Sequence, residues 1–172
     1  MIALKIYQDR VLDSLKRFFR ETARDGRPER AFRAVIESNP QPIVATYLPV
    51  MAEGLAAEMP YVCLRVPTGG GKTLLACHAA GLALKDLLHA ERGVVLWLVP
   101  SNTILNQTAD ALRDPRHDYR RALELACGSV EVMTIEEALQ LSRATVEGRT
   151  VVIVATIQSF RAEDTTGRKV YA

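Results

Sequence analysis

Two patterns of apolar and polar positions alternate along the chain: helical stretches with one apolar face, and short runs that are apolar throughout. Residues 7–23 show the first pattern, because apolar side chains recur at the period of an α-helix with charged side chains between them. The apolar positions are Val11, Leu12, Leu15, Phe18 and Phe19. This spacing predicts an amphipathic helix that packs against a larger body.

The rest of the first 59 residues also favours helices. Gly26 is a helix stop and Pro28 is a helix start, so a short second helix is expected over residues 28–38. Residues 43–58 again show a mostly helical pattern, in which Pro49 makes a kink or a boundary. We therefore expect residues 1–59 to form an N-terminal helical segment.

Strands are expected at four later runs, residues 61–66, 93–100, 130–133 and 150–155. The runs at 93–100 and 150–155 are continuously apolar, which is typical of parallel strands buried on both faces. Helices are expected between the runs, over residues 74–90, from the cap at 101–102 through Leu112, over 115–127 and over 134–142. Alternating strands and helices predict an α/β fold with a mostly parallel sheet covered by helices on both faces.

The turn after the first of these runs has the composition of a phosphate-binding loop. It stands between a predicted strand and a predicted helix and consists of Pro67, Thr68, Gly69, Gly70, Gly71, Lys72 and Thr73. Consecutive glycines let several backbone N–H groups converge on one phosphate at the positive end of the helix. Lys72 can reach the β- and γ-phosphates of a nucleotide, and the Thr73 hydroxyl can hold Mg²⁺. The alternative interpretation is a glycine-rich turn without a ligand.

Composition and charge agree with an ordinary globular α/β protein. The chain has 172 residues, 48% hydrophobic and 24% charged, and its net charge of +2 allows nucleic acid as a partner without indicating it. Cys63, Cys77 and Cys127 fit neither a disulfide framework nor a metal pattern, so a reducing cytoplasm is expected, with Cys63 inside a buried strand. No apolar run approaches ~18 residues, and residues 1–10 lack a signal peptide's apolar core, so no membrane segment is expected.

Three stretches resemble motifs of a known protein family. Residues 67–73, 98–107 and 156–160 resemble motifs I, Ia and Ic of superfamily-two helicases, most closely the DEAD/DEAH-box group that includes the restriction subunit of type III restriction enzymes. Val66 stands where the general phosphate-loop pattern begins with glycine, which favours the helicase variant Pro-Thr-Gly-x-Gly-Lys-Thr over a small-molecule kinase or G protein. Tyr7-Gln8 resembles that group's adenine-contacting glutamine motif.

The resemblance implies a RecA-like P-loop NTPase and an ATP-driven DNA helicase or translocase. Lys72 and Thr73 would be the catalytic residues, with Thr73 on Mg²⁺, and the whole loop together with Gln8 would bind ATP. The residues expected near the DNA backbone are Ser101, Asn102, Thr156 and Gln158. Their alternative role is to cap helices. The expected partners are DNA, double-stranded or held by its backbone, and a specificity or modification subunit.

The acidic pair that such an ATPase needs after a further apolar strand is missing from the sequence. No apolar run ends in Asp-Glu, and Glu163 and Asp164 follow a polar turn instead. We therefore expect residues 60–172 to be a partial helicase ATP-binding domain that stops before motif II and lacks the strands of motifs II and III. Such a fragment would be inactive alone and would expose an apolar sheet edge.

Other interpretations stay open at this point. The chain could belong to a P-loop ATPase or kinase that never touches nucleic acid, or it could be a non-catalytic nucleotide-binding module. The histidines and cysteines show no metal-ligand spacing, and Trp97 is expected to pack in the core. A basic cluster is either a solvated helix face or a phosphate-binding patch; it consists of Arg113, Arg116, His117, Arg120 and Arg121.

Overall fold

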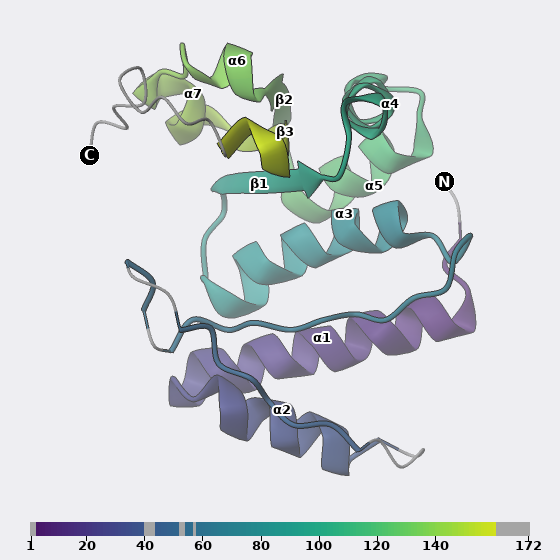
Figure 1. The fold of residues 1–172 in the computed structure, drawn as a ribbon, viewed down its shortest axis with the longest axis vertical. Helices are drawn as coiled ribbons and strands as arrows, with labels where there is room; N and C mark the ends of the chain where they lie inside the picture. The colour runs from purple at the N-terminus through teal and green to yellow at the C-terminus, as the bar shows by residue number, and fades with distance from the viewer. Residues whose placement is uncertain (1–2, 40–43, 52–53, 57, 161–172) are drawn as a thin grey trace. The chain divides into compact units, whose positions relative to one another are not determined.

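The computed structural model describes residues 3–39, 44–51, 54–56 and 58–160 of the chain (Figure 1). These residues belong to two compact units. Unit 1 contains residues 1–91 and 125–127, and unit 2 contains residues 92–124 and 128–172. Within the described residues, no helix is both long enough and apolar enough to cross a membrane.

Unit 1 begins with two helices that pack on each other, α1 (Ile6–Asp25) and α2 (Pro28–Glu37). Both helices confirm the predictions for this part of the chain. Gly26 ends α1 in the left-handed region, with a φ of 63°, and its N–H donates to the Thr22 carbonyl at 2.8 Å. Leu15 and Phe18 on the buried face of α1 form a core cluster with Ala31 of α2.

The predicted helix over residues 43–58 is wrong for the residues that the structure describes there, which carry no helix. This segment follows α2, and the chain then runs along α1 (Figure 1). Tyr47 anchors it, because its ring centroid lies 5.6 Å from that of Phe32 and 6.5 Å from that of Phe18. Packing of this ring against the two helices prevails over the local helical pattern, and Pro49 would in any case interrupt a helix.

The predicted strand over residues 61–66 is also wrong. An apolar run favours an extended backbone, but a strand requires a hydrogen-bonded neighbour, and none of the three described strands pairs with this segment. Val62 and Val66 are half-buried, whereas Tyr61 and Leu64 are exposed. Cys63 is exposed as well, contrary to the prediction that it lies inside a buried strand.

The helix after the phosphate loop, predicted over residues 74–90, begins earlier and changes its winding near its end. A regular α-helix, α3 (Lys72–Leu82), continues into a π-helical turn, η1 (Ala83–Leu87). Asp86 in η1 is only 6% exposed and accepts a hydrogen bond from Arg20 Nε of α1 at 2.6 Å. This ion pair ties the end of the helix to α1, which also contacts α3.

Over the residues described in unit 2, the sheet has three parallel strands in the order β1-β3-β2, namely β1 (Val94–Val99), β2 (Val130–Thr134) and β3 (Thr150–Thr156). The central strand β3 is buried except at Ile153, which confirms the prediction for this run. Val99 lies opposite Thr156 in the register. The turns that follow β1 and β3 therefore lie side by side at the carboxyl edge of the sheet.

Strand β1 differs from the prediction that it is buried on both faces. Val94, Leu96 and Leu98 are 52%, 50% and 47% exposed, while Trp97 between them is half-buried. These three side chains alternate along β1 and therefore share one face of the strand, and β1 lies at the edge of the sheet, where β3 is the only described strand that pairs with it. An apolar sheet edge is thus exposed in unit 2.

In the part of the chain that the structure describes, these strands are followed or connected by the helices α4 (Asn102–Arg113), α5 (Asp118–Cys127), α6 (Ile135–Ala138) and α7 (Arg143–Gly148) and by the 3₁₀-helix η2 (Ile157–Phe160). Thr134 opens α6 with the predicted capping box, although α6 ends at Ala138 and not at Ser142. α5 begins at Asp118, later than the predicted start at Pro115. His117 is its N-cap, and the Nδ1 atom of this residue accepts from the Tyr119 N–H at 3.2 Å. α7, which the sequence pattern did not predict, is capped by Ser142.

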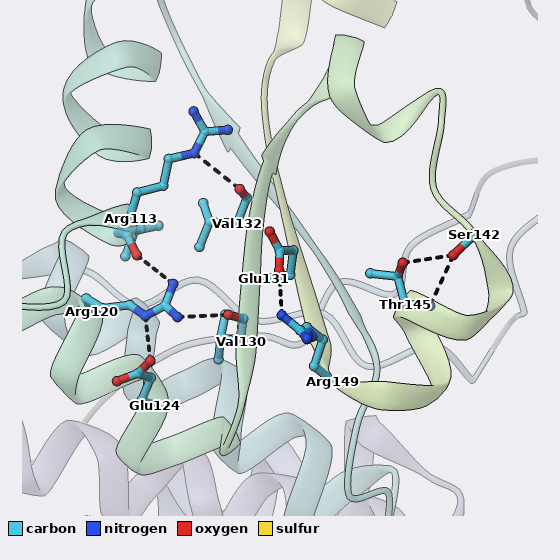
Figure 2. Close-up of polar contacts among 10 residues, drawn as sticks. Arg113, Arg120, Glu124, Val130, Glu131, Val132, Ser142, Thr145 and Arg149 are labelled. Atoms are coloured by element: carbon cyan, nitrogen blue, oxygen red, sulfur yellow. Dashed lines mark hydrogen bonds and ion pairs between the residues drawn. The ribbon is translucent and has the colours of Figure 1, made fainter.

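Two arginines of the basic cluster close the outer edge of β2 (Figure 2). Arg113 Nε donates to the Val132 carbonyl at 3.2 Å, and Arg120 donates to the Val130 carbonyl at 2.8 Å. Carbonyls alternate sides along a strand, and that of Ser129 accepts from Thr150 of β3, so those of residues 130 and 132 face outward. Arg113 and Arg120 are therefore structural, whereas Arg116 and Arg121 of the same cluster are exposed to solvent.

Candidate nucleotide-binding site

The phosphate loop of unit 1 has a shape that only glycine allows at three positions. Gly69 and Gly71 have φ values of 74° and 77°, a region that residues with a side chain seldom adopt. Gly70 has no room for a side chain, because a Cβ there would lie 2.5 Å from Val66 Cγ1 and 2.9 Å from the Pro67 carbonyl oxygen. The backbone consequently comes close to itself and leaves no side chain in front of its N–H groups.

Helix α3 starts directly at the end of this loop. Gly71 is its N-cap and provides no side-chain cap, so the first N–H groups of the helix are available to an anion. Lys72 is exposed at the first helical position, and Thr73 follows it half-buried in the first turn. The helix dipole adds positive potential at the same place.

Two carbonyl groups of the loop organise its contacts. The Pro67 carbonyl accepts from the Gly70 N–H at 3.0 Å and from Lys72 Nζ at 2.9 Å. The Gly70 carbonyl accepts from Tyr7 Oη at 2.8 Å and from Gln8 Nε2 at 3.1 Å. The lysine therefore lies folded over its own loop, and the first turn of α1 is bonded to the loop at Gly70.

Gln8 lies at the loop, where its amide contacts the loop backbone. The side chain is 4% exposed, and its Oε1 accepts from the Lys5 N–H at 2.9 Å while Nε2 donates to Gly70. A Cβ on Gly71 would lie 2.5 Å from Nε2, so this glutamine fills the space beside the loop. Its contact with adenine stays a prediction.

The four residues predicted near DNA gather at the carboxyl edge of the sheet in unit 2. Ser101 and Asn102 are exposed at the start of α4, where Ser101 Oγ accepts from the Ile104 N–H at 3.4 Å. Gln158 is exposed and its Nε2 donates to the Pro100 carbonyl at 3.4 Å, which links the two turns. Thr156 is 4% exposed, and its hydroxyl lies 2.9 Å from that of Ser159. Thr156 Oγ1 also accepts from the Ser159 N–H at 3.3 Å, so Ser101 and Thr156 both have capping contacts, and Thr156 is the buried one of the four residues.

The possible metal ligands and the cysteines add little to the phosphate loop of unit 1 or to the turns at the carboxyl edge of the sheet in unit 2. Within the described residues, no three His, Cys, Asp or Glu side chains are grouped as a metal would need, and Glu163 and Asp164 lie outside those residues. Cys77 and Cys127 are buried thiols, and burial raises their pKa values to about 12 and about 11. The loop glycines, the uncapped helix start and Lys72 fit a nucleotide phosphate, and the Thr73 hydroxyl is the group present for Mg²⁺.

A glycine loop that leads into a helix, together with a parallel α/β sheet, defines a P-loop protein with a partial RecA-like fold. A family model described as "Type III restriction enzyme, res subunit" matches residues 1–171. The chain belongs to this family, which is one of helicase-like, ATP-dependent motors. No curated protein and no solved structure matches the chain.

The sequence placed Tyr7 in the glutamine motif beside Gln8 but predicted no contact for its side chain, whose hydroxyl bonds the loop 63 positions away. The only signal in the sequence is its position next to Gln8. A tyrosine in the first turn of an amphipathic helix usually lies at the surface with its hydroxyl in solvent, and Tyr7 is indeed 39% exposed. Its contact depends on how α1 lies against the loop, which the local pattern does not specify.

Proposed function

We propose that this protein binds ATP with Mg²⁺ at residues 67–73 and couples its hydrolysis to movement along DNA, as part of a helicase or translocase motor. The observation that carries the proposal is the loop itself, whose glycines have a shape suited to phosphate and which leads into an uncapped helix start. The family match over residues 1–171 supports the interpretation of this loop as part of a motor.

The ATP would be held by the backbone N–H groups of residues 68–73 and by Lys72. Lys72 Nζ would exchange its bond to Pro67 for the β- and γ-phosphates, and the Thr73 hydroxyl would hold Mg²⁺. Gln8 would contact the adenine. In this proposal residues 1–59 are a helical segment that contributes Gln8, and residues 60–172 are a partial ATP-binding domain.

The DNA backbone would lie against the two linked turns of unit 2. The α4 start offers the N–H groups of Asn102 and Thr103, and Gln158 offers an amide. These groups suit sugar-phosphate oxygens and carry no sequence information, so a specificity or modification subunit would recognise the DNA site. We place the protein in the cytoplasm because its three cysteines are thiols and not disulfides.

Fluorescence anisotropy with a labelled DNA duplex tests the DNA part. The key variant is Asn102→Asp, because a carboxylate at the first turn of α4 favours the helix but repels a phosphate. Gln107→Glu, an exposed amide-to-acid change on the same helix, is the control. We expect Asn102→Asp to weaken DNA binding roughly tenfold at low salt, the control to bind as the unchanged protein does, and affinity to fall as salt rises.

Two results would contradict this expectation. Equal DNA affinity of Asn102→Asp and the unchanged protein would remove the α4 start from the DNA site. Saturable ATP binding with no DNA binding at any salt concentration would favour a P-loop ATPase or kinase that does not act on nucleic acid, in which residues 101 and 156 serve only as caps.

A further inference from the structure

One peptide group of the phosphate loop is held from α1 through its carbonyl. The Gly70 carbonyl accepts two hydrogen bonds, from Tyr7 Oη at 2.8 Å and from Gln8 Nε2 at 3.1 Å. Gly70 is buried, and both Gly70 and Gly71 lack a side chain that could fix their peptide in another way. The two α1 side chains therefore decide how this peptide is oriented.

The orientation of that carbonyl also determines where the next N–H points. The Gly70 carbonyl and the Gly71 N–H belong to the same planar peptide group, and no peptide bond of the described residues is cis. In a trans peptide the two groups point in opposite directions, so a carbonyl directed at α1 directs the Gly71 N–H away from α1. Among the described residues, this N–H has no hydrogen-bond partner. A free, fixed N–H of this kind is what a phosphate loop offers to a nucleotide.

We propose that Tyr7 is a positioning residue of the nucleotide site, which orients the Gly70–Gly71 peptide so that the Gly71 N–H can donate to the β-phosphate. This inference rests on the proposed ATP binding. Gln8 shares the acceptor, but its amide also bonds the Lys5 N–H and packs beside Gly71. The Tyr7 contact can be removed without disturbing others, because the ring is partly exposed and the hydroxyl bonds only the loop among the described residues.

Without the hydroxyl, one of the two bonds on the carbonyl is lost, and the peptide between two glycines can rotate more freely. A loop that spends part of its time with the Gly71 N–H turned away binds β-phosphate more weakly, in proportion to the time lost. A single neutral hydrogen bond predicts an effect of about three- to tenfold. The effect should be confined to ligands that carry a β-phosphate.

The test compares Tyr7→Phe with Tyr47→Phe in the whole 172-residue chain. Tyr47 is the matched control, because its hydroxyl also bonds the main chain of unit 1, at Tyr61 and Met59, away from the loop. Competition against a fluorescent nucleotide gives the affinities for ADP and AMP. We expect Tyr7→Phe to bind ADP about three- to tenfold more weakly and to bind AMP with unchanged affinity. Tyr47→Phe should leave the ratio of the two affinities unchanged.

NMR relaxation without any nucleotide provides a second measurement that does not depend on ATP binding. Tyr7→Phe should lower the ¹⁵N order parameter of the Gly71 N–H, because the peptide rotates more freely, while Tyr47→Phe leaves it unchanged. An unaltered order parameter at Gly71 together with an unaltered ADP-to-AMP ratio would overturn the positioning role. If the unchanged protein binds no ADP at all, the proposed function fails, and the order parameter alone decides whether Tyr7 orients the peptide.

Discussion

Gly71 carries the strictest conformational demand in the phosphate loop. Its φ of 77° costs a residue with a side chain about 1–2 kcal/mol, and a Cβ would also displace Gln8 Nε2, 2.5 Å away. We expect Gly71→Ala to lower the free energy of unfolding by about this amount and to abolish measurable ATP binding. Urea denaturation and calorimetric titration would check both effects.

Gly148→Ala is the matched control for this change. Gly148 lies in α7, lacks a positive φ and has open space where an alanine methyl group would stand, with no contacting atom within 4 Å. Alanine there should be neutral or stabilise by about 0.5–1 kcal/mol. Equal losses of stability in the two variants would show that the loop does not hold Gly71 in its left-handed conformation.

Cys63 provides a chemical test of the corrected segment at residues 61–66. Its side chain is exposed, whereas Cys77 and Cys127 are buried with raised thiol pKa values. Because the thiolate is the nucleophile, we expect a thiol reagent at neutral pH to modify one cysteine rapidly and the other two only after unfolding. Mass spectrometry of the modified peptide should locate the label at residue 63. Protection of all three thiols would instead favour the original prediction that Cys63 lies inside a buried strand.

At the scale of elements, Arg120 connects three parts of unit 2. Its guanidinium donates to the Leu112 carbonyl at the end of α4, to the Val130 carbonyl of β2 and to Glu124 on its own helix, and the side chain is only 17% exposed (Figure 2). We expect Arg120→Met to cost about 2 kcal/mol of unfolding free energy, because it leaves two main-chain carbonyls without their charged donor.

Arg143→Met is the comparison for this prediction, since Arg143 pairs with Glu147 on α7 at 91% side-chain exposure. An exposed pair of this type contributes about 0.5 kcal/mol or less. Thermal denaturation of both variants measures the difference. If they melt together, the arginine contacts to β2 are not structural, and the cluster of residues 113–121 regains its interpretation as a solvated face.

Elements whose signals are local were predicted well, and elements that depend on distant partners were not. The helix stop at Gly26, the Thr134 capping box and the central apolar run of β3 each act within a few residues, and the structure confirms them. Residues 61–66 have the composition of a strand, but pairing depends on which other segment lies alongside. The same limit applies to β1, whose exposed face follows from its place in the strand order.

For the molecule as a whole, the phosphate loop could be predicted from seven adjacent residues, since the chemistry of phosphate binding resides in contiguous backbone, and the family could be predicted from that loop together with residues 98–107 and 156–160. The grouping of the turns after β1 and β3 also follows from the parallel sheet. The hydrogen bonds from Tyr7 and Gln8 to the Gly70 carbonyl could not be predicted from the sequence, because they join residues that are more than 60 positions apart.

Binding of ATP with Mg²⁺ to the purified chain, measured by calorimetric titration for the unchanged protein and for Lys72→Ala, tests the central claim most directly. Lys85→Ala, which removes a lysine of η1 outside the loop and exposed to solvent, is the control. A lysine that reaches the phosphates predicts roughly 10- to 100-fold weaker binding by Lys72→Ala, with circular dichroism unchanged and with the control equal to the unchanged protein. Equal affinity of the three proteins, or no binding by any of them, would contradict a nucleotide site at residues 67–73.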